Sequence, residues 1–146
     1  MKTKFILMII ILVASCSSND EDNEQPTINL ALLYGQWFHI DLCPTQNNLV
    51  LNNNGNYTHT YSGNTCDNNE NDTYQSTGTF SISGDEIFFN EQSEAVIEEG
   101  EGNGTTIGDF TTLIYQKIIL LTDTQLIIER KFNNGQDYFN NWHLTK

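Results

Sequence analysis

Two Asn-Asn-Gly triplets, each set between runs of β-forming residues, constrain the fold of this chain more than any other feature. They lie at residues 53–55 and 133–135. Asn and Gly tolerate the positive φ values that tight hairpin turns require, so the flanking runs are predicted to pair as antiparallel hairpins. After the first triplet, residues 57–61 alternate aromatic or histidine rings with threonine, which is the period of a strand with one buried face.

The same signals divide most of the chain into eight short strands, with no long amphipathic helix between them. They are expected at residues 36–42, 48–51, 57–61, 78–82, 86–89, 110–120, 125–132 and 138–144. Consecutive hairpins favour an all-β, eight-stranded antiparallel up-and-down barrel, preceded by a short helical turn within residues 28–33. A β-sandwich has the same periodicity and is the alternative. The acidic, glycine-rich section that follows residue 89 is predicted to be a loop or a weakly formed edge segment.

The start of the first strand carries a family resemblance. A helical turn followed by Gly35-Gln36-Trp37 resembles the Gly-x-Trp signature of lipocalins, and residues 28–146 look like the lipocalin-like domains of Bacteroidetes lipoproteins. The resemblance implies that Gly35 ends the helical turn, that Trp37 closes one end of the barrel, and that an arginine from a late strand packs across it. Arg130 is the candidate, because it shares a face of its strand with Leu126 and Ile128.

The first 27 residues have the organisation of an exported, lipid-anchored protein. Two lysines precede an apolar run over residues 5–14 that is too short to span a bilayer, so residues 1–15 are predicted to be a signal peptide. Val13-Ala14-Ser15-Cys16 resembles a bacterial lipobox, which implies cleavage before Cys16, lipidation of that cysteine, and membrane attachment through it. Residues 16–27 are predicted to be a disordered acidic tether. Their acidic run resembles the surface-export signal of Bacteroidetes lipoproteins, which implies an outer membrane lipoprotein exposed at the cell surface; the periplasmic face is the alternative.

Charge narrows the class of partner. The chain has 6 basic and 19 acidic residues, and removal of Lys2 and Lys4 with the leader takes the net charge from −13 to −15. Such a field repels phosphate backbones, so no nucleic-acid partner is expected.

Two cysteines remain once Cys16 is assigned to lipid. Cys43 and Cys66 are separated by 22 residues, and an exported protein lies in an oxidising compartment. They are therefore predicted to form a disulfide, the alternative being a reactive thiol.

Metal and catalytic signatures are weak or missing in the sequence. The acidic loop at residues 67–72 has hard oxygen ligands but departs from the EF-hand pattern, and His39, His59 and His143 lack close metal-ligand spacing, although closure of the barrel would allow His39 to approach His143. No Gly-x-Ser-x-Gly, phosphate-binding loop or His-Glu-x-x-His is present. We therefore expect no metal site, no cofactor and no enzymatic activity.

Two functions remain open. One is a binding module whose barrel holds a small apolar ligand. The other is a filled barrel that acts as a structural, interaction or inhibitor domain through a protein partner. Bulky residues on the inward faces favour a filled interior, with Tyr57, Tyr61, Phe80 and Phe89 as the expected filling.

Overall fold

The computed structural model describes residues 28–102, 112–133 and 136–146. The predicted signal peptide, lipobox and tether lie outside the described residues. The elements are one helical turn and nine strands: α1 Leu30–Leu33, β1 Gly35–His39, β2 Asn48–Leu51, β3 Asn56–Tyr61, β4 Thr73–Ser83, β5 Glu86–Glu98, β6 Thr112–Leu121, β7 Gln125–Asn133, β8 Asp137–Phe139 and β9 Trp142–Thr145.

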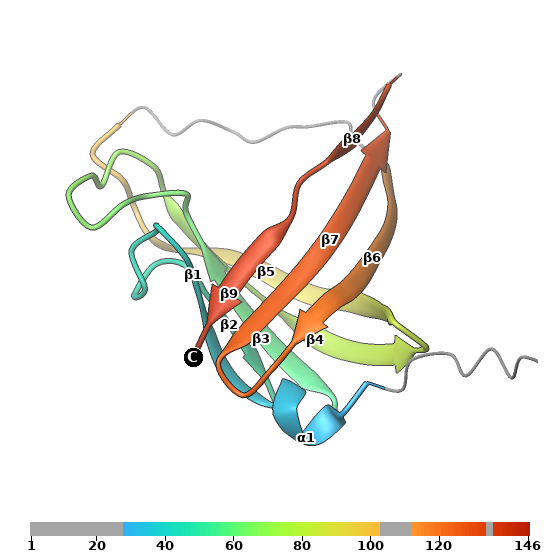
Figure 1. The fold of residues 1–146 in the computed structure, drawn as a ribbon. Coiled ribbons are helices and arrows are strands. Elements are labelled where there is room, and N and C mark those ends of the chain that lie inside the picture. Colours follow the sequence, from blue (N-terminus) through green and yellow to red (C-terminus); the bar gives the residue numbers. More distant parts are fainter. Residues whose placement is uncertain (1–27, 103–111, 134–135) are drawn as a thin grey trace, which may run out of the picture.

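The strands form a closed antiparallel barrel of eight positions, which confirms the predicted fold class (Figure 1). Each strand from β1 to β7 pairs with its successor, and β9 completes the ring by pairing with both β7 and β1. The short strand β8 continues β9 along β7 in one register, as the pairs Lys131↔Phe139 and Ile128↔Trp142 show. The predicted strand at residues 138–144 is therefore one strand interrupted at residues 140–141.

The turns follow the local chemistry of the sequence. Gly55 ends the first Asn-Asn-Gly triplet with a φ of 82°, as a tight hairpin between β2 and β3 requires. In the second triplet Asn134 and Gly135 lie outside the described residues, and the strands that flank them pair at Asn133↔Asp137. Both hairpins form where the sequence predicts them.

The largest difference from the predicted elements concerns β4 and β5. Both are much longer than expected, because residues 73–77, which precede the predicted strand at residues 78–82, pair with residues 93–98 of the acidic section. Backbone hydrogen bonds drive this pairing, and most side chains of β5 beyond Phe89 are exposed. The acidic section up to Glu98 is thus an ordered strand, while residues 103–111 lie outside the described part.

One end of the barrel, which we call the closed end, is filled. There α1 lies across the barrel bottom (Figure 1), and the side chain Nε1–H of Trp37 donates a 2.8 Å hydrogen bond to the Leu33 carbonyl. Gly35 joins helix to strand with a φ of 131°, a conformation that other residues rarely adopt. The core consists of Leu33, Trp37, Leu49, Leu51, Tyr57, Ile87, Ile118, Leu126, Ile128 and Leu144.

Candidate functional site

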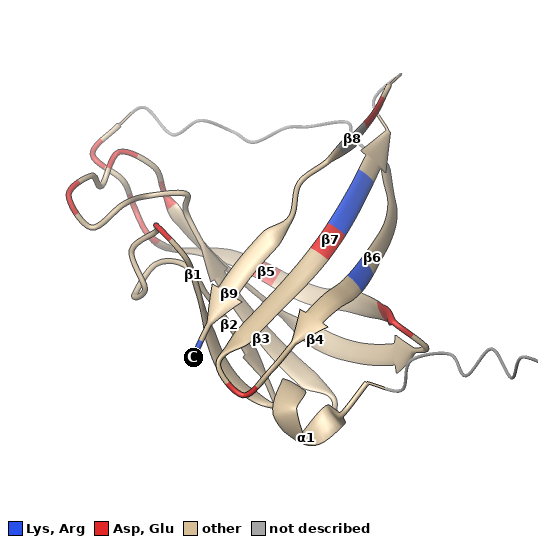
Figure 2. Ribbon diagram, in the orientation of Figure 1, with Lys and Arg blue, Asp and Glu red and all other residues tan. Residues whose placement is uncertain are grey.

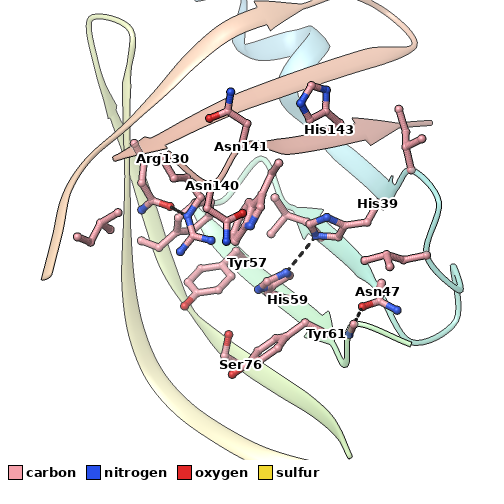
Figure 3. Close-up of a pocket in the computed structure, with 18 of the residues that line it drawn as sticks. His39, Asn47, Tyr57, His59, Tyr61, Ser76, Arg130, Asn140, Asn141 and His143 are labelled. Atoms are coloured by element: carbon pink, nitrogen blue, oxygen red, sulfur yellow. Dashed lines mark hydrogen bonds between the residues drawn. The ribbon is translucent and has the colours of Figure 1, made fainter. Parts of the chain in front are cut away.

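The opposite end of the barrel is hollow. A cavity of about 1050 Å³ opens there, lined by side chains from β1, β3, β7 and β9 and by the loops that follow β1 and β3 (Figure 3). At this end the inward-facing side chains leave the interior open, so the alternative of a barrel filled along its whole length does not hold. Phe80 and Phe89 pack against the core, to which Tyr57 belongs, and Tyr57, Tyr61 and Phe89 also form part of the cavity wall.

The cavity has a clear origin in the sequence of inward-facing positions. Towards the open end, β1 changes from Trp37 to His39 and β7 from Ile128 to Arg130, while β4 presents Ser76 to the cavity. The strands also separate: β5 and β6 pair only at Glu86↔Lys117 among the described residues, and they diverge beyond it (Figure 1). Alternate side chains of each strand therefore still face the barrel interior. Towards the open end, these inward-facing side chains no longer fill the space that the strands enclose.

Two histidines meet on the cavity wall. The Nε2 atoms of His39 and His59 lie 3.3 Å apart, so one ring donates its proton to the other (Figure 3). Burial is the main cause that lowers the pKa of His39 to about 4 and that of His59 to about 3, and the nearby Arg130 charge lowers both further. Both rings are therefore neutral at pH 7.

This pair is not the one that the sequence suggested. His39 was expected to approach His143, but the inward positions of β9 belong to Trp142 and Leu144, and His143 is exposed. His39 and His59 both contact Trp142, with ring centroids 5.5 and 4.6 Å from its ring. The sequence signal for this contact was only that residues 39 and 59 both face inward.

Arg130 lies on the cavity wall to one side of the histidine pair (Figure 3). Its Nε donates a 3.1 Å hydrogen bond to Oε1 of Gln116. Its Cζ atom is 4.2 Å from the centroid of the Trp142 ring and 4.8 Å from that of Phe132. The prediction that Arg130 faces inward with Leu126 and Ile128 is confirmed, because all of them lie on the interior side of β7.

The predicted contact between Arg130 and Trp37 was wrong. The cation over Trp37 is Lys146, whose Nζ lies 4.2 Å from the ring centroid and donates a 2.7 Å hydrogen bond to the Leu32 carbonyl. Strand register explains the difference, because the pairings of β1, β9 and β7 align Trp37 with Lys146 and Thr124. Arg130 is six residues further along β7, about 20 Å from that level at roughly 3.3 Å per residue.

Loops held by asparagine side chains form part of the cavity rim. Asn47 is 1% exposed, and its amide nitrogen donates to the carbonyls of Cys43 and Asn64 at 3.2 and 3.0 Å. Its side-chain oxygen accepts hydrogen bonds from the backbone of Ser62 and Gly63 at 3.0 and 2.9 Å. Sequence reasoning treated the many asparagines as turn formers and missed this buried network.

The two cysteines belong to the same loops. Sγ of Cys43 lies 2.6 Å from Sγ of Cys66, and the two residues are present as free thiols. The structure thus brings the predicted partners together without a bond between them. The disulfide stays a prediction.

The acidic loop at residues 67–72 uses its oxygens within the protein. Oδ1 of Asp72 accepts a 2.9 Å hydrogen bond from the Gly100 backbone, and Oδ1 of Asn69 accepts one of 2.8 Å from Gln46. Among residues 28–102, 112–133 and 136–146, no three metal-binding side chains come together.

Within the described part of the chain, no helix has the length and apolar character needed to cross a membrane. Comparison of the chain with known protein families, with curated proteins and with solved structures found no match.

Proposed function

We propose that this chain is a lipid-anchored, lipocalin-like binding protein that holds one small, largely apolar molecule in the open end of its barrel. The observation that carries the proposal is the cavity, because a barrel whose only role was structural would be expected to fill its interior as it does at the closed end. Its volume suits a small molecule, since ligand pockets measure roughly 300–1,000 Å³. The proposal includes no catalytic step.

The sequence of the leader supports the anchoring part of this proposal. The signal peptide at residues 1–15, the lipobox ending at Cys16 and the tether at residues 16–27 together favour an outer membrane lipoprotein displayed at the cell surface. Mass measurement of Cys16-containing peptides from the membrane fraction of the host tests this part. Acyl chains on Cys16 are the expected result, and an unmodified cysteine within an uncleaved leader would contradict it.

Binding in the cavity can be tested with an uncharged fluorescent probe, N-phenyl-1-naphthylamine, whose emission rises in apolar surroundings. Ser76 lines the cavity, whereas Ser81 lies on the same strand with its side chain exposed. We expect one saturable site in the wild-type protein, a large loss of affinity in Ser76→Phe because the new ring occupies the cavity, and no loss in the matched control Ser81→Phe. Absence of saturable binding would reject the proposed function.

A further inference from the structure

We propose that the free edge of β5 is a docking site for a protein partner, and that the segment it binds is an extended, basic peptide that joins the sheet as an added strand. This inference is independent of the small-molecule cavity. It follows from the hydrogen-bonding edge that β5 leaves unpaired, from the apolar side chains exposed beside that edge, and from the carboxylates that the strand carries.

One edge of β5 lacks a strand partner over most of its length. The other edge pairs with β4 from Glu86 to Glu98. On the free side, among the described residues, β6 pairs with β5 only at Glu86↔Lys117, and the two strands then diverge (Figure 1). The backbone groups that residues 88–98 present on this side can therefore pair with a further strand, which is the mode by which sheet edges bind extended peptides.

Large apolar side chains are exposed beside this edge. Phe88, Val96 and Ile97 of β5 are 49%, 47% and 53% exposed. On the other side of the opening between the two strands, Leu113 and Ile114 of β6 are 39% and 49% exposed. Apolar surface with polar surroundings is typical of protein interaction sites. A strand added to β5 would cover part of this apolar surface while it pairs with the backbone.

Two carboxylates lie on one face of the free part of β5. Glu91 is opposite Gly78 of β4 and Glu94 is opposite Ser76, because a bulge adds one residue to β5 between them. The two β4 residues share a face of their strand, so both glutamates lie on one face of β5, and both are exposed. A strand that adds to β5 therefore meets two acidic side chains on the same face.

No ion pair between described residues neutralises these glutamates. Figure 2 shows the basic residues on β6, β7 and at the C-terminus, and β5 itself contains none. The Glu94 carboxylate accepts a hydrogen bond from the Tyr61 hydroxyl, which is a neutral group. The ion pairs between described residues involve the carboxylates of Asp85 and Asp137. Lysine or arginine side chains of an added strand would therefore face carboxylates that have no counter-ion, an arrangement that stabilises cross-strand pairs.

The same charges disfavour a second copy of this chain as the added strand. Two β5 edges paired with each other would bring the acidic side chains of both copies together, and the chain has a net charge of −13. Charged side chains on an edge are a common protection against such self-pairing. A basic chain is the strand that complements β5 both in hydrogen bonding and in charge.

Fluorescence anisotropy with two labelled, capped peptides tests the charge of the partner. One has the sequence Lys-Val-Lys-Thr-Lys-Val-Lys, and the other has glutamate in place of every lysine. We expect saturable binding of the lysine peptide that weakens as salt is added, and an affinity for the glutamate peptide at least about tenfold lower. Equal affinity for the two peptides would overturn the inference.

A pair of double variants tests whether β5 is the site. Glu91→Gln with Glu94→Gln should lower the affinity for the lysine peptide by about twofold to fivefold for each charge removed, the range of exposed ion pairs. The matched control, Asp67→Asn with Asp123→Asn, removes the same charge from exposed positions outside β5 and should keep the affinity. Near-UV circular dichroism verifies the fold of both variants. Equal losses in the two would count against the inference, because the peptide would then respond to net charge and not to β5.

N-methylated peptides test the backbone pairing in the wild-type protein. Methyl groups on alternate backbone nitrogens remove the N–H donors from one edge of a strand and leave the charges of its side chains unchanged. Two versions of the lysine peptide, methylated at odd or at even positions, together cover both edges. We expect at least one of them to bind roughly tenfold more weakly than the parent peptide, because main-chain hydrogen bonds supply the affinity of an added strand. Affinity retained by both versions would overturn the inference.

A second copy of the chain is the other occupant to test. Sedimentation equilibrium of the protein alone should find a monomer, and a dimer that the lysine peptide disrupts would overturn the choice of a basic partner. Absence of saturable binding of the lysine peptide would reject the docking site altogether. None of these outcomes bears on the cavity, where the uncharged probe and the Ser76→Phe variant test the proposed function separately.

Discussion

Replacement of Trp37 by Ala should remove most of the stability of the barrel. The side chain is fully buried at the closed end, so its truncation leaves a cavity whose cost is about 3–5 kcal/mol. The Leu33 carbonyl also loses its 2.8 Å hydrogen bond, and a buried group left unsatisfied costs a further 1–3 kcal/mol or so. We therefore expect a loss of about 5 kcal/mol, which approaches the total stability of about 5–15 kcal/mol typical of a domain.

Urea denaturation followed by far-ultraviolet circular dichroism measures this loss without relying on the mutated fluorophore. Trp37→Phe keeps a ring in the core but loses the indole N–H, so it should be intermediate between wild type and Trp37→Ala. Trp142→Ala is the matched control, because that indole lies on the cavity wall and is partly exposed. A free energy of unfolding for Trp37→Ala within about 1 kcal/mol of wild type would refute the assignment of Trp37 to the core, where truncations of this size cost more.

Three further predictions follow from the described contacts. His39 and His59 have folded-state pKa values of about 4 and about 3 against roughly 6.5 when unfolded, so the unfolded chain binds more protons below pH 6.5. The free energy of unfolding should fall by about 2 kcal/mol per histidine between pH 7.5 and pH 5, and urea titrations of His59→Phe should show a smaller fall. A Cβ added at Gly78 would lie 2.1 Å from the Asn90 carbonyl oxygen on β5, so Gly78→Ala should destabilise the protein by about 1–3 kcal/mol in the same assay, and an unchanged midpoint would contradict the β4–β5 register. Mass spectrometry of protein prepared without reductant should find Cys43 joined to Cys66, and Cys43→Ser should then lower stability by about 3 kcal/mol in the absence of reductant alone; two free thiols in oxidised protein would reject the disulfide.

Local chemistry explains which parts of the fold could be predicted from the sequence. The hairpin at residues 53–55 depends on the positive φ of Gly55, a requirement that acts within four residues and is visible in the sequence. The length of β5 was not visible in this way. Glu91, Glu94 and Glu98 are exposed on that strand, and it is held by backbone pairing with β4, which polar side chains do not reveal.

The site was predictable only in part for a related reason. The alternation of side chains along a strand correctly predicts that Arg130 faces the barrel interior. Its position along the barrel axis depends on the registers of β7, β9 and β1, which no local sequence pattern determines. The same non-local registers place His59, rather than His143, beside His39. The cavity itself depends on how far β5 and β6 diverge, a property of the closed barrel and not of either strand alone.

Acrylamide quenching of the two tryptophans tests most directly the central claim that the barrel is filled at one end and hollow at the other. The chain has two tryptophans, so Trp37→Phe leaves Trp142 as the sole indole and Trp142→Phe leaves Trp37. We predict strong quenching of Trp142 on the cavity wall and weak quenching of Trp37 in the core. Equally weak quenching of both would contradict the account, because it would mean that the interior around Trp142 is packed.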